Sequence, residues 1–483
     1  MFLMARHNGY LLAGMPMDAG MLWGMALIVL GVGAAGYGLL PAAREPIAPV
    51  TARPSEDAPL NRAHLLLMAV LVAALVVDVM KPASLGFVLP GMRAEYGLSK
   101  SMAAWLPFSA LSGTFAGSLA WGMLADLYGR RASILLSTIL FVGTSICGAM
   151  PSFAWNAGMC FLMGAAAGGL LPVVYALLAE TMPARHRGWA LVLVGGLGAA
   201  GGYVAASAGS ALLQPLFGWR IMWFLNVPTG LLLVLLSGLI PESPRFMIAA
   251  GRIEAARAVL ARFGAALIVE APRAAAPAPR MSGALGVALT AAGLAWGLIT
   301  FGVLLWLPAE LVAAGHPIAA TSRLLAQSAL LALPASAVSA VLYARWQAKG
   351  TLLAALAVTA AGLAGLALLG PETAPILLAA AILVGSNSLL ATLLPYTAEL
   401  FPAAMRGRAT GWVSGATKSG GILAQGFGLA GVLPAIAPAA GLVALLLAGA
   451  GVLIWRFGAE TRGRRLEDLE SGAVLEAAAI AAE

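Results

Sequence analysis

Long apolar stretches separated by short polar turns dominate the pattern of this chain. Each approaches or exceeds the roughly 20 residues that an α-helix needs to cross the hydrocarbon core of a bilayer. One set covers 64–90, 101–123, 132–150, 155–179, 189–213 and 221–240, and a second covers 282–311, 322–343, 351–370, 374–398, 409–432 and 436–457. The pattern therefore predicts an all-α membrane protein with six spanning helices on each side of a polar segment at 241–281.

A further apolar, glycine-rich run at 21–40 stands before this body. We expect an extra N-terminal helix there; a cleaved signal peptide, with small residues at 41–43 behind it, and an interfacial helix are the alternatives. Several prolines and mixed charges at 41–63 indicate a linker. The expected domains are the N-terminal helix and linker at 1–63, a six-helix bundle at 64–240, a cytoplasmic central loop with an amphipathic helix at 241–281, a second bundle at 282–457 and a cytoplasmic tail at 458–483.

Composition supports this class. The chain is 61% hydrophobic and only 10% charged, which no soluble domain of 483 residues approaches. A net charge of +8 would suggest nucleic acid as the partner of a soluble protein, but here the basic residues gather in alternate loops and set the orientation instead. With the 41–63 linker inside, the cytoplasmic side is strongly basic. We therefore expect a multi-pass protein of the cell membrane, the inner membrane if it is bacterial, with no nucleic-acid partner.

An internal repeat relates the two sets of helices. Glu180-x-x-Pro183-x-x-x-Arg187-Gly188 recurs as Glu399-x-x-Pro402-x-x-x-Arg406-Gly407, with one offset of 219 residues at all five positions. The same offset carries Arg130 onto Lys349. Two repeated halves of parallel topology are typical of secondary transporters.

Several charged turns carry a family resemblance. Gly122-Met-Leu-Ala-Asp126-Leu-Tyr-Gly129-Arg130-Arg131 resembles the loop between helices 2 and 3 of the major facilitator superfamily. Pro241-Glu242-Ser243-Pro244-Arg245, Tyr396-Thr-Ala-Glu399-Leu-Phe-Pro402 and Glu460-Thr461-Arg462-Gly463-Arg464 are similar to its sugar-porter and metabolite:proton symporter branch. The resemblance covers roughly 63–470 and implies the major facilitator fold, two six-helix bundles around a central cavity.

The resemblance also implies a gating charge network at the cytoplasmic helix ends. Its members are Asp126, Arg130, Arg131, Glu180, Arg187, Arg345, Glu399 and Arg406. Glu180 is expected to pair with Arg130, and Glu399 with Arg345, in locks that hold while the carrier faces outward. A static staple that only fixes topology is the alternative. Because Arg345 stands where the offset of 219 would place Asp126, we expect the second lock to be the weaker one.

Ionisable residues inside the spans are the first candidates for function, because charge within a membrane is costly. Asp78 is expected to be the proton site, since related sugar and aromatic-acid symporters carry an acidic residue in this part of helix 1. Sugar porters pair it with an arginine at the position of Cys160, and Lys81, one turn after Asp78, is expected to supply the missing cation. A structural ion pair, or Lys81 reaching to the interface, is the alternative.

Lys418 lies about nine residues into helix 11, near the middle of the membrane. An anionic ligand would relieve the cost of that charge, so Lys81 and Lys418 favour an organic anion as substrate, unless both lysines pair internally. Tyr175, Gln327 and Asn387 are possible cavity residues, with helix–helix hydrogen bonding as the alternative.

No phosphate loop or metal-ligand spacing indicates an enzyme, and no cofactor is expected. The sequence predicts a secondary active transporter that imports a small polar metabolite with protons by alternating access, with a carboxylate favoured. A sugar or polyol porter, a drug/proton exporter and a non-transporting nutrient receptor on a carrier fold are the alternatives. The expected partners are a small-molecule substrate, protons and the lipid bilayer, and the carrier is expected to be a monomer.

Overall fold

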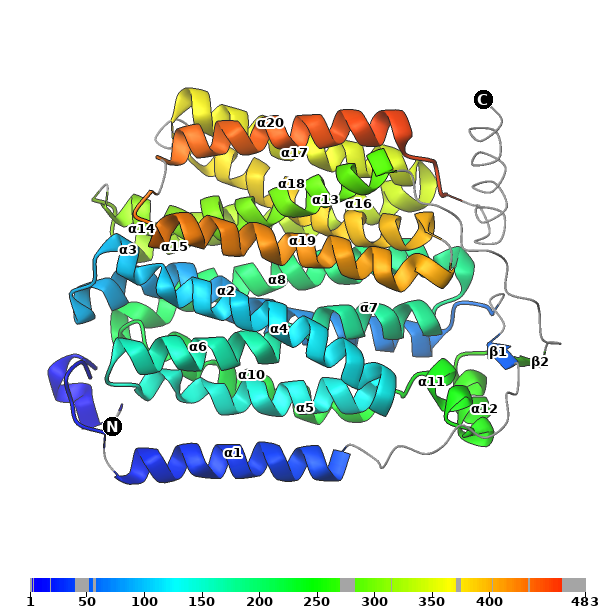
Figure 1. Cartoon of the computed structure of the whole chain (residues 1–483), viewed down its shortest axis with the longest axis horizontal. Helices are drawn as coiled ribbons and strands as arrows, with labels where there is room; N and C mark the ends of the chain where they lie inside the picture. Colours follow the sequence, from blue (N-terminus) through cyan, green and yellow to red (C-terminus); the bar gives the residue numbers. More distant parts are fainter. Residues whose placement is uncertain are drawn as a thin grey trace.

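The computed structural model of the chain describes residues 2, 4–17, 19–39, 52–54, 58–269, 283–313, 315–370, 375–401, 403–432 and 435–462. Nearly all of these residues are helical, and the long helices run roughly parallel or antiparallel to one another (Figure 1). In this part of the chain, eleven helices are long and apolar enough to cross a membrane. The expected all-α membrane fold is confirmed.

The N-terminal half contains six rods, several of them interrupted by a short break. They are α2 (Arg62–Tyr96), α3 (Lys100–Ala103) with α4 (Trp105–Tyr128), α5 (Arg130–Gly143) with η2 (Thr144–Ala149), α6 (Phe153–Ala167) with α7 (Leu170–Thr181), α8 (Ala184–Phe217), and α9 (Ile221–Phe224) with α10 (Asn226–Leu236) and η3 (Ser237–Leu239).

The C-terminal half repeats this arrangement. Its rods are α13 (Gly283–Leu298) with the π-helical turn η4 (Ile299–Val303) and α14 (Leu304–Ala313), α15 (Ile318–Leu330) with α16 (Ala332–Arg345), α17 (Ala348–Leu369), α18 (Pro375–Leu400), α19 (Ala403–Leu429) and α20 (Ile436–Phe457). Two short helices, α11 (Pro244–Ala249) and α12 (Ile253–Arg262), lie between the halves in sequence.

Local signals set the helix ends. The Asn61 side chain accepts hydrogen bonds from the backbone N–H groups of Ala63 and His64 and so caps α2, which ends at Gly97 with a φ of 62°. Gly129 joins α4 to α5 with a φ of 106°, a conformation that favours glycine. We call the end that carries Gly129, α11 and α12 the basic end, and the end that carries Gly97 the opposite end.

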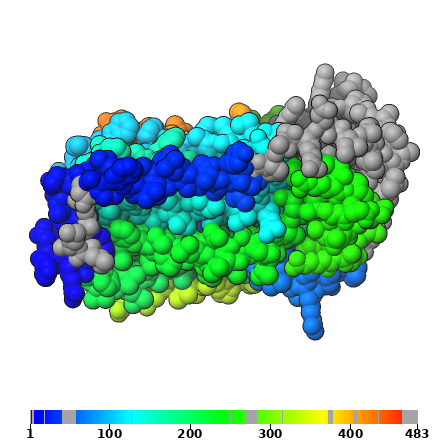
Figure 2. All heavy atoms as spheres, turned by 90° about the horizontal axis from the view of Figure 1, so that it is seen from below, coloured from blue at the N-terminus to red at the C-terminus, as the bar shows by residue number. Residues whose placement is uncertain are grey.

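The expected extra helix is α1 (Ala19–Leu39), which lies along the outside of the N-terminal half against α5 (Figures 1 and 2). Ile28 packs so closely on Gly143 that a Cβ atom there would lie 2.7 Å from it, and Gly36 faces Leu136. The two helices therefore run antiparallel. The linker behind α1 is held as well, because β1 (Ala52–Pro54) pairs antiparallel with β2 (Leu267–Val269) of the central loop.

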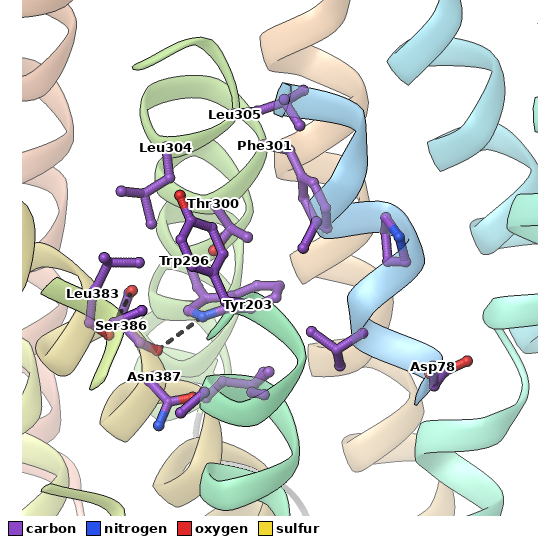
Figure 3. A pocket seen from close by; sticks show the side chains of 18 of the residues that line it. Asp78, Tyr203, Trp296, Thr300, Phe301, Leu304, Leu305, Leu383, Ser386 and Asn387 are labelled. Carbon is purple, nitrogen blue, oxygen red and sulfur yellow. Dashed lines mark hydrogen bonds between the residues drawn. The ribbon is translucent and has the colours of Figure 1, made fainter. Parts of the chain in front are cut away.

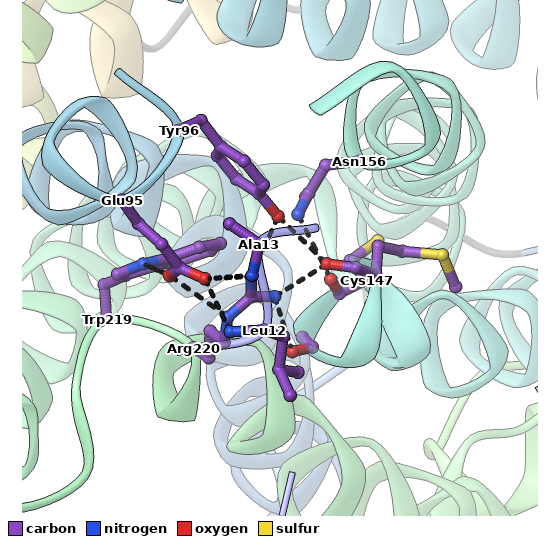
Figure 4. Close-up of polar contacts among 10 residues, drawn as sticks. Leu12, Ala13, Glu95, Tyr96, Cys147, Asn156, Trp219 and Arg220 are labelled. Atoms are coloured by element: carbon purple, nitrogen blue, oxygen red, sulfur yellow. Dashed lines mark hydrogen bonds and ion pairs between the residues drawn. The ribbon is translucent and has the colours of Figure 1, made fainter. Parts of the chain in front are cut away.

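Residues before α1 dock on the opposite end of the N-terminal half (Figure 4). The buried Glu95 carboxylate accepts hydrogen bonds from the backbone N–H groups of Leu12 and Ala13 at 2.7 and 2.9 Å. It also pairs with the fully buried Arg220 at 2.6 Å and accepts from Trp219 Nε1 at 2.7 Å. The N-terminal segment thus supplies two hydrogen bonds to the buried Glu95–Arg220 ion pair.

Several contacts join the two halves at or toward the opposite end. Lys100 of α3 forms an ion pair with Glu310 of α14, and Ser101 Oγ donates to Leu429 O at 2.9 Å. Deeper in the interface, Ser210 and Ser322 share a hydrogen bond of 2.8 Å between their hydroxyls. These contacts hold the halves together on that side of the molecule.

Candidate functional site

A cavity of about 160 Å³ lies between the two halves, at mid-length of the helices. Residues of α2, α4, α8, α13, α14, α18 and α19 contribute to its wall, which is mostly apolar. The polar or amphipathic side chains in the wall are Asp78, Thr114, Tyr203, Trp296, Thr300, Ser386, Asn387 and Lys418. Such a concave, apolar space with a few polar groups is the usual form of a small-molecule site.

Aromatic rings make up much of one side of the cavity. Trp296 donates from Nε1 to Ser386 O at 2.9 Å, which fixes the indole, and its ring meets Phe301 edge-on with centroids 5.8 Å apart. Figure 3 shows Tyr203 of α8 close to Trp296, Thr300 and Phe301 of the other half. Thr300 and Phe301 belong to the π-helical turn η4, a distortion that is frequent at functional sites.

Asn387, one of the expected cavity residues, lies in the wall of this cavity. Its Nδ2 donates to Gly196 O at 3.1 Å and to Ser336 Oγ at 2.9 Å, so it also links α18 to α8 across the interface. Both bonds use the amide nitrogen, which leaves the carbonyl oxygen for a ligand.

Asp78 and Lys418 bring opposite charges to the same cavity from opposite halves. Lys418 Nζ donates to Ser414 Oγ at 3.2 Å. In the described part of the chain, the Asp78 carboxylate has no hydrogen bond and no ion pair within 4 Å. In Figure 3, Asp78 lies apart from Ser386 and Asn387.

The expected pairing of Asp78 with Lys81 is corrected by the structure. Lys81 is fully buried, and its Nζ donates to Phe141 O at 2.9 Å and to Thr144 Oγ1 at 2.6 Å, 4.3 Å from the centroid of the Phe141 ring. The Phe141 carbonyl is in the last turn of α5, where carbonyl groups lack helical partners. Lys81 therefore holds α2 to α5, and the cation that faces the cavity is Lys418.

The two other uncharged candidates do not line this cavity. Tyr175 of α7 packs its phenol against Gly195, and Gln327 of α15 is exposed. Sequence patterns do not single out Tyr203, Trp296, Thr300 or Phe301, because single aromatic or hydroxyl residues in an apolar helix carry no signal of what they face.

At the basic end, four residues form what we call the N-half cluster: Arg130, Glu180, Glu242 and Ser243. The expected pair is present, with Arg130 Nη2 3.2 Å from Glu180 Oε1, and the Ser243 hydroxyl donates to Glu180 as well. Glu242 Oε1 accepts from the backbone N–H of Arg130 at 2.7 Å and so caps α5. All four residues belong to the N-terminal half and the loop that follows it.

The C-half cluster consists of Tyr343, Glu399, Glu460 and Thr461. Glu399 Oε2 accepts hydrogen bonds from Tyr343 Oη and Thr461 Oγ1, both at 2.7 Å, and Glu460 caps α17 by accepting from Ala348 N at 2.8 Å. The expected pairing of Glu399 with Arg345 is thereby corrected.

Arg345 is exposed, and the last turn of α16 instead presents the buried Tyr343 to Glu399. Glu399 lies against Gly188 of α8, the residue that follows Arg187. The C-half cluster therefore contacts the other half.

Three other members of the expected charge network are Asp126, Arg131 and Arg406. The side chains of Asp126, in α4, and Arg406, in α19, lie outside the described residues. Arg131 is exposed and takes part through its backbone N–H, which donates to Glu242 at 3.3 Å. Among the residues that the structure describes, no group of three or more His, Cys, Asp or Glu side chains gathers as metal ligands do.

Comparison with known proteins places the chain. Residues 65–425 match the model of the Major Facilitator Superfamily. The niacin transporter NiaP of Acinetobacter baylyi is 25% identical over 386 residues, which are 76% of this chain and 87% of the relative. The 4-hydroxybenzoate transporter PcaK of the same species is 32% identical over 202 residues, 41% of this chain and 43% of the relative.

Solved structures agree on the fold. The proton:xylose symporter XylE superposes with a TM-score of 0.67 at 18% identity, over 84% of this chain and 98% of the symporter. A partially occluded, inward-open form of XylE from E. coli gives a TM-score of 0.66 at 17% identity, over 84% of this chain and 100% of the neighbour. The arrangement of two six-helix halves thus has a known counterpart, and the chain belongs to the major facilitator superfamily of multi-pass membrane transporters, which are not enzymes.

Proposed function

We propose that this carrier imports a small aromatic carboxylate together with a proton. The observation that carries the proposal is Lys418, an ammonium group facing a cavity whose other walls are largely apolar and aromatic. Charge next to apolar surface is costly unless an opposite charge relieves it, and a carboxylate on a ring offers both the charge and a matching apolar body.

The size of the cavity agrees with a ligand of one ring. Its volume is about 160 Å³, and an apolar protein cavity of about 150 Å³ is known to bind benzene. A sugar of similar size would require hydrogen-bond partners for many hydroxyl groups, whereas this wall offers few. The geometry therefore favours an aromatic acid over the sugar or polyol alternative.

Proton coupling follows from the charge balance of the cavity wall. Among the described residues that line it, Asp78 is the one carboxylate and Lys418 the one ammonium group. A substrate carboxylate that pairs with Lys418 leaves Asp78 without the positive charge that shares its cavity, in mostly apolar surroundings that penalise an uncompensated anion. Protonation of Asp78 removes that penalty, so anion and proton bind together.

The names of related proteins support this substrate class. The relatives include transporters of niacin and 4-hydroxybenzoate, both of which are carboxylic acids on a single aromatic ring. The structural neighbour XylE is named as a proton symporter. We therefore assign to this chain an aromatic carboxylate as substrate, as in the two named relatives, and a proton as the coupling ion, as in XylE.

Uptake into proteoliposomes tests the proposal. With an acid exterior, labelled benzoate, 4-hydroxybenzoate or nicotinate should accumulate, xylose should not, and a protonophore should abolish accumulation. Lys418→Ala should weaken anion binding by about 1–3 kcal/mol, as for a hydrogen bond to a charged group, and Lys418→Arg should restore part of it.

Asp78→Asn should abolish accumulation but retain counterflow of the same acid, because exchange needs no net proton movement. Accumulation of xylose instead of the acids, or accumulation against a gradient by Asp78→Asn, would refute the corresponding half of the proposal.

A further inference from the structure

The Tyr203 hydroxyl is a polar group of the cavity wall that the proposed function leaves without a role. Its oxygen is buried and has no hydrogen-bond partner within the described part of the chain. The ring of Tyr203 lines the cavity from α8 and meets Phe87 of α2 edge-on, with centroids 5.8 Å apart. A buried phenol normally finds a partner, so this hydroxyl is an exception that calls for one.

Three other tyrosines of this protein follow the rule. Tyr96 donates to Met150 O at 2.9 Å, Tyr396 to Ala459 O at 2.7 Å, and Tyr343 to Glu399 at 2.7 Å. Tyr203 differs from these three in facing the substrate cavity. A ligand bound in that cavity is therefore the missing partner that its position allows.

We propose that the Tyr203 hydroxyl recognises a second polar group on the aromatic ring of the substrate, a ring hydroxyl or a ring nitrogen. The inference rests on the proposed function and makes it narrower: the preferred substrate is an aromatic acid with a hydrogen-bonding ring, rather than unsubstituted benzoate. Tyr203 thereby sets specificity, while Lys418 binds the carboxylate.

The chemistry of the phenol suits this task. A tyrosine hydroxyl both donates and accepts, so it can donate to a ring nitrogen or accept from a ring hydroxyl. Around it the wall offers Trp296, Phe301 and Leu304 as apolar surface for the ring itself (Figure 3). A site that leaves a buried hydroxyl unpaired discriminates against a ligand that fails to satisfy it.

Tyr175 provides a matched control. Its hydroxyl is also buried and without a partner among the described residues, but it packs against Gly195 and does not line the cavity. Removing either hydroxyl deletes one unpartnered oxygen, and only the removal at position 203 changes the surface that a ligand meets.

The experiment measures the dissociation constants of benzoate, 4-hydroxybenzoate and nicotinate for the purified full-length wild type, Tyr203→Phe and Tyr175→Phe. Wild type should bind 4-hydroxybenzoate or nicotinate more tightly than benzoate. Tyr203→Phe should weaken that tighter binding about tenfold, the size of one lost hydrogen bond, and leave benzoate unchanged. Tyr175→Phe should alter none of the three constants, and neither variant should unfold at a lower temperature.

The possible failures are distinguishable. If Tyr203→Phe keeps the wild-type preference, or weakens benzoate as much as the other two acids, the assignment of Tyr203 is overturned while the proposed function stands. If wild type binds none of the three acids, the proposed function fails and the role of Tyr203 fails with it.

Discussion

The N-half and C-half clusters share one arrangement of side chains but differ in one of the groups that contact the central glutamate. In both, a glutamate caps the helix that opens the next hairpin, and the following Ser243 or Thr461 donates its hydroxyl to the glutamate of the repeated motif. The dipeptides Glu242-Ser243 and Glu460-Thr461 are related by an offset of 218 residues. The third partner differs, because a guanidinium meets Glu180 and a phenol meets Glu399.

That difference separates two roles. The charge of Glu180 is balanced by Arg130 inside the N-terminal half, so this cluster joins elements of one half. The hydroxyls around Glu399 carry no net charge, and this carboxylate lies against Gly188, the neighbour of Arg187 in the other half. Pairing within a half and contact between halves are thus divided between the two clusters, and we propose that the contact at Glu399 is the one that opening must break.

The largest effect is expected for Glu180→Gln, which removes the charge that balances a mostly buried guanidinium. The apparent unfolding free energy should fall by about 1–3 kcal/mol. Transport should fall more than ligand binding, because the cavity lies elsewhere. Thermal unfolding in detergent, counterflow and equilibrium binding measure the three quantities. An equal loss of binding and transport would contradict this division of roles.

A smaller effect on stability is expected for Glu399→Gln. The amide oxygen still accepts from Tyr343 and Thr461, so the cost should stay below about 1 kcal/mol. Loss of the charge that lies against Gly188, next to Arg187 of the other half, should instead favour opening at the basic end.

The measurement is the rate at which an impermeant thiol reagent modifies Ser386→Cys from that side, after Cys147 and Cys160 have been replaced by serine. We expect a rise of a few fold. Glu180→Gln in the same background is the comparison, and an equal rise there would remove the distinction between the clusters.

The smallest effect is expected on the pH dependence of stability, through Glu242, the carboxylate that caps α5. Burial raises the pKa of the Glu242 carboxyl above its usual value of 4.5, although hydrogen bonds from Ser243, Arg130 and Arg131 oppose the shift. A group whose pKa is raised by folding stabilises the fold at pH values below its unfolded pKa, and this contribution is lost as pH rises through the folded pKa. Relative to Glu242→Gln, the wild type should therefore lose stability as pH rises from 4.5, by on the order of 1 °C in unfolding temperature.

Scans of unfolding temperature between pH 4.5 and 8 check this prediction. Glu460→Gln makes the same change at the matching cap and controls for the loss of a capping carboxylate. A parallel pH course of wild type and Glu242→Gln would show that burial of Glu242 does not matter to stability.

The helices and their order were predictable, because a bilayer imposes length and apolarity on every span. The pair Arg130–Glu180 was predictable from the motif that contains it. The partners of Lys81 and Glu399 were not, because each depends on the side chain that a neighbouring helix presents in three dimensions. Lys81 meets the carbonyl end of α5, and Glu399 meets a tyrosine two residues before the arginine that the family resemblance suggested.

Cavity residues were the least predictable. Asp78 and Lys418 stood out because charge in a membrane span is rare. Tyr203, Trp296 and Phe301 resemble the many aromatic residues that pack against lipid or protein, and only the meeting of the two halves makes them a wall. The sequence therefore identifies the charged residues of such a site, but not the residues that form the wall of its cavity.

The docking of the N-terminal segment has a practical use in spectroscopy. Leu12 and Ala13 bind Glu95, and α1 packs on α5, so both belong with the N-terminal half as that half moves. Tyr37 on α1 is 93% exposed and Trp455 on α20 is 66% exposed. Spin labels at these two positions would be attached to one half each, away from the cavity and from both clusters. The distance between the labels would then measure the movement of the two halves relative to each other.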